Sequence, residues 1–225
     1  MSEILTSVIL PSRARPEQLR RSIESLKTNA LYRMEVLVAF DDDDERSIMS
    51  FVEDPIEGMS FIVMPRVGYL FLHHYVNRLA LMARGRWVFL WNDDCIMESS
   101  HWDEILHEKR GEFVFLNPSS NHDNHPSGAC IFPIVPRSYV STLGHFSRSN
   151  HNDTYVEKIA NVLGLRLDIP MYVRHERADL TGLNNDSVYA ERAFTTSDFY
   201  GAEMQRHIAE DAERIRVFAE SLNRT

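Results

Sequence analysis

Residues 84–94 read Arg84-Gly85-Arg86-Trp87-Val88-Phe89-Leu90-Trp91-Asn92-Asp93-Asp94. Five large apolar residues in succession, 87–91, predict a short strand that is buried on both faces. The strand runs into three polar side chains, Asn92, Asp93 and Asp94. Ligands of open α/β sheets bind at the carboxyl ends of the strands. Because two adjacent carboxylates repel each other unless a positive group lies beside them, the pattern favours a divalent cation that carries a phosphate-bearing ligand.

The sequence before this strand alternates between predicted strands and helices. Strands are expected where apolar runs are short and end at a proline or an acidic run, and helices where apolar residues recur at helical spacing. This alternation predicts an α/β, Rossmann-like fold with a mostly parallel central sheet flanked by helices. The expected strands are 7–11, 34–40 and 60–64, and the expected helices start at Pro16, lie around 48–52 and span 72–83.

The second half of the sequence has a different character. A polar loop is expected at 117–128, and residues 176–196 have so little periodicity that we expect an active-site flap or an extended arm. A final amphipathic helix is expected after Asp198. The remaining expected elements are a helix around Trp102, strands 113–116, 129–135 and 167–174, a helix from Pro136 to Gly144, and a helix from Asn152 to Gly164.

Length and composition suit one globular domain. The chain has 225 residues, of which 44% are hydrophobic and 25% charged, and such a chain can bury a full core. The formal net charge of −9 and the absence of a basic block argue against binding of bulk nucleic acid. The two cysteines, the lack of a visible secretory signal and the lack of an apolar run of bilayer length predict a soluble, cytoplasmic protein without a membrane segment.

Three stretches of the sequence resemble a known family, the GT-A fold glycosyltransferases of family 2. These are residues 7–16, residues 34–42, and Asn77 together with residues 83–94. The resemblance covers the first half of the chain and implies a single GT-A domain over residues 1–225. Within that domain it implies a nucleotide-sugar-binding half at 1–98, an acceptor-side half with a flap at 99–196, and a C-terminal amphipathic helix at 197–225.

The resemblance also implies an activity. The family moves a sugar from a nucleotide-diphosphate donor to an acceptor hydroxyl and inverts the anomeric centre, so we expect a UDP-type donor and Mn²⁺ or Mg²⁺ as cofactor. We expect a soluble acceptor, because no membrane segment is visible. A saccharide, a protein side chain and a modified nucleobase all remain open as acceptors.

The metal ligands implied by the resemblance are Asp94 and His175. Asp94 would bind the cation, and Asp93 would contact the ribose of the donor or the ion. His175 ends the last predicted strand, where related enzymes often complete the metal or diphosphate site. The alternatives are that the aspartates only cap the next helix and that His175 is an ordinary surface or core histidine.

Two loops are expected to bind the donor. The cationic loop with Ser12 and Arg15 lies at a strand's carboxyl end, where phosphates bind, although it could be a plain solvent loop. In the acidic run that starts at Asp41, either Asp41 or Asp42 would accept the N3–H of a uracil, and the later acids would begin a helix. The full set expected to bind the nucleotide sugar is Pro11, Ser12, Arg13, Arg15, Asp41, Asp42, Asn77, Arg78, Asn92 and Asp93.

Asp153 is the candidate general base. It precedes a predicted helix that carries apolar residues at helical spacing, so it could be simply the N-cap. The resembled family has an acidic residue near this position that faces the donor sugar, and a carboxylate with a modestly raised pKa can take a proton from an acceptor hydroxyl. Glu157, one helical turn later, is the second candidate.

Two other functions are compatible with parts of the sequence. A nucleotidyltransferase would need a glycine-rich phosphate loop after the first strand, but residues 12–15 contain no glycine. A non-catalytic module that binds a sugar or nucleotide on the same scaffold is the main alternative. It is supported by Asn92, where the family's metal motif begins with aspartate, and by Val76, where the family often has arginine.

Overall fold

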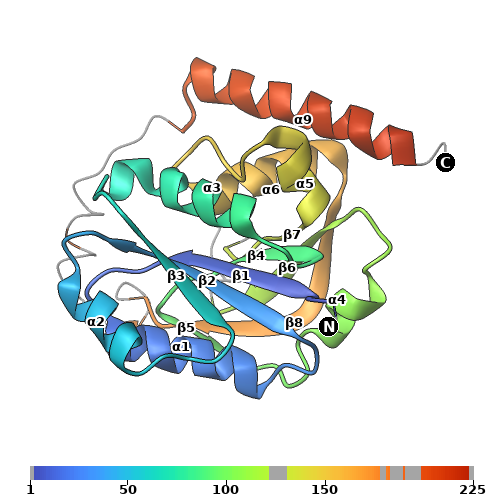
Figure 1. The fold of residues 1–225 in the computed structure, drawn as a ribbon. Helices are drawn as coiled ribbons and strands as arrows, with labels where there is room; N and C mark the ends of the chain where they lie inside the picture. Colours follow the sequence, from blue (N-terminus) through green and yellow to red (C-terminus); the bar gives the residue numbers. More distant parts are fainter. Residues whose placement is uncertain (1–2, 122–130, 178–180, 183–189, 191–198, 223–225) are drawn as a thin grey trace.

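One mixed sheet forms the centre of the molecule (Figure 1). The structure is a computed structural model that describes residues 3–121, 131–177, 181–182, 190 and 199–222. The strands are β1 (Thr6–Pro11), β2 (Met34–Asp41), β3 (Met59–Met64), β4 (Trp87–Leu90), β5 (Cys95–Met97), β6 (Phe115–Ser120), β7 (Ile134–Pro136) and β8 (Arg166–His175). The helices are α1 (Pro16–Thr28), α2 (Glu45–Glu53), the 3₁₀ helix η1 (Tyr69–Phe71), α3 (Leu72–Met82), α4 (Glu104–Glu108), α5 (Arg137–Leu143), α6 (Asn152–Leu163) and α9 (Ala202–Leu222).

The strand order is β3-β2-β1-β4-β7-β6-β8-β5. The first four of these strands pair in parallel, as do β6 and β8. β7 runs antiparallel to β4 and β6, and β5 runs antiparallel to β8. The structure therefore confirms an α/β, Rossmann-like single domain with a mostly parallel sheet. Because β1, β2 and β4 point the same way, their carboxyl ends lie at one edge of the sheet.

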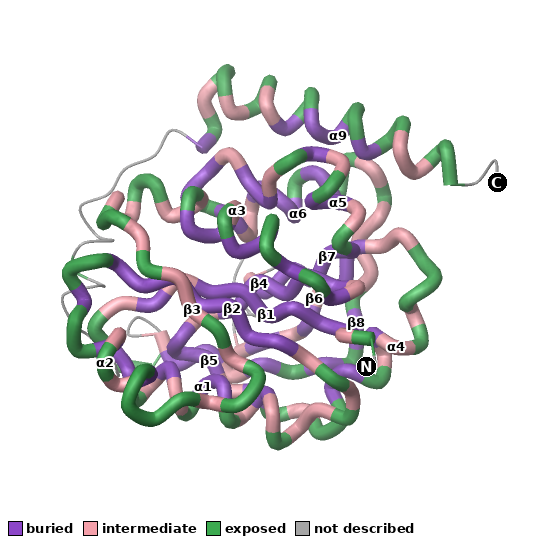
Figure 2. The backbone as a smooth tube through the Cα atoms, viewed as in Figure 1, coloured by how far each residue is buried: buried purple, intermediate pink, exposed green. Residues whose placement is uncertain are grey.

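Helices cover both faces of the sheet. α1 and α2 lie on one face, and α3, α5, α6 and α9 lie on the other (Figure 1). Each face has its own apolar core, and β4 contributes to both: Trp87 and Phe89 belong to one core and Val88 and Leu90 to the other. Figure 2 shows the strands as mainly buried and the outer surfaces of the helices as exposed. The prediction that residues 87–91 are buried on both faces is thus confirmed.

The second half of the sheet differs from the prediction in three places. Residues 117–120, expected in a loop, extend β6, because β8 pairs with them and a register shift at Pro118 accommodates the proline. β5 was not predicted, because three residues are too short to show a periodicity. β7 begins at Ile134 rather than at 129, and residues 129 and 130 lie outside the described residues.

The expected C-terminal helix is present as α9, which packs on α5 and α6. Its apolar residues Ile208 and Ile215 are buried, whereas Leu222 is 46% exposed. Asp211 of α9 is fully buried and accepts hydrogen bonds from the Tyr155 hydroxyl and, at 2.7 Å, from Arg148 Nη2. Most of the expected flap at 176–196 and the expected cap Asp198 lie outside the described residues. No helix in the described part of the chain is long and apolar enough to cross a membrane.

Gly85 allows β4 to begin close to β1. Its backbone N–H donates to Ser7 Oγ at 2.8 Å, and Ser7 Oγ donates to Glu35 at 2.6 Å. A Cβ atom at Gly85 would lie 2.5 Å from the backbone nitrogen of Ser7. That distance is far below van der Waals contact, and backbone atoms cannot rotate away as a side chain can.

We expect Gly85→Ala to lower the free energy of unfolding by about 3 kcal/mol, because the new methyl group forces β1 and β4 apart. Urea denaturation would measure the change. Gly111→Ala is the matched control, since a Cβ there meets nothing within 4 Å. Equal stability of the two variants would show that the strands separate without cost.

Candidate functional site

A cavity of about 230 Å³ lies at the carboxyl edge of β1, β2 and β4. It is lined by the loop after β1, the ends of β2, β4 and β8, the loop before α3 and the start of α6. All but three of the predicted site residues line it, the exceptions being Asp42, Asn77 and Arg78. The predicted residues that line it are Pro11, Ser12, Arg13, Arg15, Asp41, Asn92, Asp93, Asp94, Asp153 and His175.

Asp93 is held by the loop after β1. Its carboxylate accepts a hydrogen bond from Ser12 Oγ at 2.7 Å and forms an ion pair with Arg15 Nη1 at 3.2 Å. Burial raises the pKa of Asp93 to about 6, with the charge of Asp94 adding to the rise and Arg15 opposing it. The positive group beside Asp93 is thus an arginine of the same chain, where the sequence argument favoured a metal ion. Asp94, the other aspartate, instead contacts His175.

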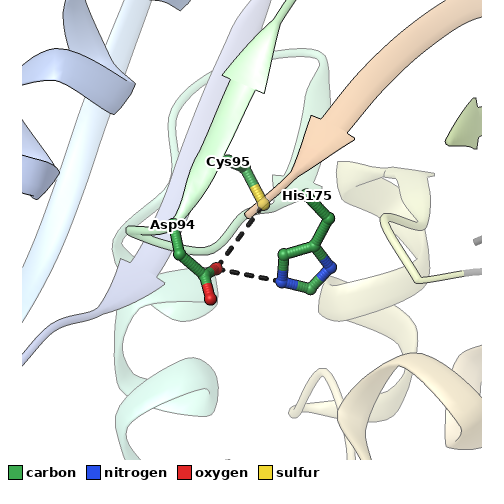
Figure 3. A group of neighbouring side chains, drawn as sticks. All are labelled: Asp94, Cys95 and His175. Atoms are coloured by element: carbon green, nitrogen blue, oxygen red, sulfur yellow. Dashed lines mark hydrogen bonds and ion pairs between the residues drawn. The ribbon is translucent and has the colours of Figure 1, made fainter. Parts of the chain in front are cut away.

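Asp94, Cys95 and His175 form a buried group at the end of the sheet (Figure 3). Antiparallel pairing places Cys95 opposite His175. His175 Nε2 lies 2.9 Å from Asp94 Oδ1, and Cys95 Sγ lies 3.8 Å from the same oxygen. One possible ligand atom from each residue lies within 4.8 Å of the others, and within the described residues this is the only such group of three.

The chemistry of this group fits a divalent cation. A carboxylate oxygen suits Mg²⁺ and Mn²⁺, and an imidazole nitrogen suits transition metals. Both residues are buried, Asp94 with 5% and His175 with 3% of its surface exposed. Burial and the neighbouring carboxylates raise the pKa of the Cys95 thiol well above its usual range, so the thiol is protonated and donates to Asp94. Sequence reasoning missed Cys95 because no cysteine spacing marked it.

The acidic residues at the end of β2 form hydrogen bonds with the loop after β1 and with Tyr75 of α3. Asp41 lines the cavity and accepts hydrogen bonds from the Tyr75 hydroxyl and, at 2.7 Å, from Arg13 Nη1. Burial and the hydrogen bond to Asp41 raise the pKa of Tyr75 to about 12. Asp44 caps α2 through the Ser47 N–H at 3.3 Å and also accepts the N–H of Ala14. Of the two aspartates weighed for base recognition, the structure places Asp41 at the cavity, while Asp42 is exposed.

Asp153 lies at the cavity in the first turn of α6. It is the second helical residue rather than the N-cap, which is His151. Burial raises the pKa of Asp153, and a hydrogen bond of 2.8 Å from the Thr154 N–H opposes the rise. Glu157, the second candidate base, does not line the cavity and forms an ion pair with Arg166 at 2.8 Å. Of the two acids, only Asp153 can therefore meet a ligand in the cavity.

Asn77 lies outside the cavity and holds the segment that leads to Asp153. Its Oδ1 accepts the backbone N–H groups of Phe146 at 2.8 Å and Ser147 at 3.0 Å, and its Nδ2 donates to the Ser147 carbonyl at 2.8 Å. Further hydrogen bonds continue through Ser149 to the N–H of His151, the N-cap of α6. The structure thus gives Asn77 a positioning role, and Arg78 beside it is exposed.

We expect Asn77→Ala to lower the free energy of unfolding by about 2 kcal/mol, because backbone groups that it satisfies lose their partner. Hydrogen exchange at the Phe146 and Ser147 amides should become faster. Asn77→Asp keeps an acceptor for both amides and should have a smaller effect. Leu81→Ala, at a position of the same helix that is 55% exposed, is the control. Unchanged exchange in Asn77→Ala would refute the role.

Several cavity residues were not found from the sequence. Tyr75 and Asn150 were given no role, and Asn152 was given none beyond the start of a helix. The only available signal was that Asn152 directly precedes Asp153. The other such residues that line the cavity are Ala39, Arg66, Gly68, Tyr69, Leu72, Val76, Leu90, Ile131 and Arg177.

The chain is similar to known glycosyltransferases. Residues 7–113 match the family model described as Glycosyl transferase family 2. The fold is similar to that of the mannosyltransferase PcManGT from Pyrobaculum calidifontis, solved with GDP-Man and Mn²⁺ (TM-score 0.60, 12% identity, 78% of this chain and 57% of that chain). It is also similar to S. aureus TarS 1–349, solved with UDP (TM-score 0.58, 12% identity, 76% of this chain and 60% of that chain). No curated protein matches the chain in sequence.

The strand order and the two structural likenesses show a fold of the GT-A type. Within that fold, residues 7–113 are similar to glycosyltransferase family 2. The chain spans 57% and 60% of the length of the two solved proteins. At 12% identity these two likenesses show the shared fold.

Proposed function

We propose that the chain transfers a sugar from a nucleotide-diphosphate donor to an acceptor hydroxyl. One observation carries this proposal: three kinds of group line the same cavity. Asp41 is a carboxylate that could accept a hydrogen bond from a nucleobase, Asp94 and His175 could bind a metal ion, and Asp153 is a candidate base. These groups come from four separate parts of the chain. A nucleotide-diphosphate sugar has a base, a diphosphate and a reacting carbon, and could contact all of them.

The donor would lie along the loop after β1. Asp41 would accept a hydrogen bond from the base, and a UDP-type donor offers the uracil N3–H for this contact. Arg13 and Arg15 are oriented by ion pairs with Asp41 and Asp93, and their remaining N–H groups would donate hydrogen bonds to the phosphates. In this proposal residues 1–98 bind the donor, and residues 99–196 contribute the side on which the acceptor binds.

Asp94 and His175 are the residues that would hold Mn²⁺ or Mg²⁺. A divalent cation, when bound, offsets the negative charge that builds on a departing diphosphate. Asp93 is kept in place by Ser12 and Arg15, so its remaining lone pairs are available to the ribose. This arrangement gives the two adjacent aspartates different roles.

Asp153 would act as the general base. Its raised pKa matches a carboxylate that must take a proton near neutral pH. The acceptor oxygen forms a bond to the anomeric carbon, the bond from that carbon to the diphosphate oxygen breaks, and the acceptor proton moves to Asp153. Attack from the side opposite the leaving group inverts the anomeric centre.

The second candidate is a binding module without catalysis. Asn92 favours it, because it lines the cavity where the resembled family's metal motif begins with aspartate, and a carboxamide is a weaker ligand for a divalent cation than a carboxylate. Such a module would bind a nucleotide sugar and release no product. The two functions differ in turnover rather than in binding.

A thermal-shift screen with UDP-glucose, UDP-N-acetylglucosamine and GDP-mannose, each with and without Mn²⁺, tests the donor site. A cognate donor should raise the melting temperature only when the metal is present. The release of nucleoside diphosphate in the presence of mixed acceptors then separates the enzyme from the module. A chain that binds none of the three donors would contradict the proposal.

A further inference from the structure

His175 is the last residue of β8, where it lies opposite Cys95 of β5. The ladder hydrogen bond beside this pair runs from the Glu176 N–H to the Asp94 carbonyl at 2.8 Å. In an antiparallel ladder, that pattern directs the N–H and C=O groups of His175 away from β5, and it brings the two opposed side chains close together. The imidazole and the Cys95 thiol accordingly both reach Asp94 (Figure 3).

On the side away from β5, the side chain of Asn121 binds the backbone of His175. The pairing of β6 with β8 ends at Ser120, which lies opposite Val173, and Asn121 follows directly. Its Oδ1 accepts the His175 N–H at 2.8 Å, and its Nδ2 donates to the His175 carbonyl at 2.9 Å. Because an N–H can only donate and a carbonyl can only accept, these two partners fix the orientation of the carboxamide. Asn121 thus supplies the pair of bonds that a further strand residue would supply.

These two hydrogen bonds hold the backbone from which a proposed metal ligand projects. His175 Nε2 lies 2.9 Å from Asp94 Oδ1, and the ring of the fully buried Phe132 packs against the imidazole with 5.2 Å between the ring centres. The distance between the two ligand atoms therefore depends on where the end of β8 lies. Residues that orient metal ligands commonly change metal affinity by about 10- to 100-fold.

We infer that Asn121 is a positioning residue for the cation site, acting through the backbone of His175. This inference rests on the proposed function, in which Asp94 and His175 hold the cation. Asn121 is not among the residues that line the cavity, so it contributes no ligand atom there. Its loss should weaken binding of the cation while both ligand side chains remain present.

Titration of the full chain with Mn²⁺, followed by the electron paramagnetic resonance signal of the free ion, tests this inference. The titrations are run with and without UDP or GDP, because a diphosphate supplies further oxygen ligands. In Asn121→Ala the dissociation constant for Mn²⁺ should rise about tenfold. His175→Ala removes the ligand atom itself and should cause a larger rise.

Asn29→Ala is the matched control. Asn29 Nδ2 donates to the backbone carbonyls of Ser25 at 2.9 Å and of Met97, in β5, at 3.1 Å. The variant therefore loses two hydrogen bonds between a carboxamide and the backbone, one of them to β5, and neither involves His175. Its affinity for Mn²⁺ should equal that of wild type.

Thermal melting without metal separates positioning from folding. Asn121→Ala and Asn29→Ala should lose comparable stability, whereas only Asn121→Ala should lose affinity for Mn²⁺. Asn121→Thr is the second variant, for use if Asn121→Ala is unfolded at the temperature of the titration. Its single hydroxyl can satisfy one of the two backbone groups at a time, so its affinity should fall in the same direction by a smaller factor.

The outcomes separate this inference from the proposed function. If His175→Ala weakens Mn²⁺ binding but the folded Asn121 variants bind Mn²⁺ as wild type does, the Asn121 inference is overturned and the metal site stands. If wild type binds no Mn²⁺, or if His175→Ala binds it as wild type does, the proposed metal site is absent and the inference fails with it.

Discussion

Asp153→Asn is expected to reduce turnover by about 10²- to 10⁴-fold, the usual contribution of a positioned general base. Asparagine keeps the shape of the side chain and cannot take the acceptor proton. Donor affinity should be unchanged, because the contacts proposed for base, diphosphate and metal come from other elements. Initial rates and donor titrations on the same preparation measure both quantities.

The pH dependence of turnover is a second test of the role of Asp153. Burial, opposed by the Thr154 N–H, raises its pKa, and the base must be ionised. Turnover should therefore rise with pH through a value above the ordinary aspartate pKa of about 4. A carboxyl group whose pKa is raised in the folded state stabilises the fold only at low pH, and this contribution is lost as the pH rises through the folded-state pKa. Asp153→Asn should therefore not lower the melting temperature at pH 7.

These expectations make the role of Asp153 testable. Glu157→Gln is the control, because Glu157 is paired with Arg166 away from the cavity. Turnover in Asp153→Asn within tenfold of wild type, with the same acid limb, would assign the proton transfer to another group. A parallel loss of donor affinity would instead indicate that Asp153 binds the donor.

Asp94→Ala is expected to reduce turnover by roughly 10³-fold, which corresponds to about 4 kcal/mol of lost transition-state stabilisation. It should also abolish the Mn²⁺-dependent rise in melting temperature with a nucleotide sugar. The reason is that only His175 and the protonated Cys95 thiol would remain of the buried group of three. Thermal shift with and without Mn²⁺, together with rate measurements, checks both effects.

Asp54→Ala provides the comparison for this variant, since the Asp54 side chain is 79% exposed at the end of α2. It removes the same charge from the protein without touching the cavity. If Asp94→Ala keeps the full response to Mn²⁺, the metal binds elsewhere. The assignment of Asp94 and His175 would then be wrong.

The parts of the fold that sequence reasoning predicted were those with strong local signals. The run 87–91 could form only a doubly buried strand, and the apolar runs before it had helices between them. Because strand ends carry ligands in this architecture, residues at 11–15, 41 and 92–94 could be brought to one cavity without coordinates. Asp153 and His175 needed the resemblance as well.

The missed features depend on contacts between distant residues. β5 exists because β8 lies beside it, and no property of three residues reveals that. The pairing of Asp93 with Arg15 joins residues 78 positions apart. Asn77 resembled a ligand-binding residue, but its hydrogen bonds go to a backbone segment about 70 positions further along the chain. Propensity and spacing do not encode such partners.

The buried carboxylate of Asp211 ties the stability of α9 to acidity. Burial alone would raise its pKa, but hydrogen bonds from His145 and Tyr155 and the charges of His145 and Arg148 outweigh burial and lower it. The stabilisation is therefore present above the ordinary aspartate pKa and is lost only as pH falls through a still lower value. Arg148 belongs to the segment that Asn77 also holds. At strongly acidic pH, α9 should therefore detach from the domain, and the segment around Arg148 that leads to Asp153 should lose this contact in the same transition. Mild acidification should leave both the helix and the segment in place.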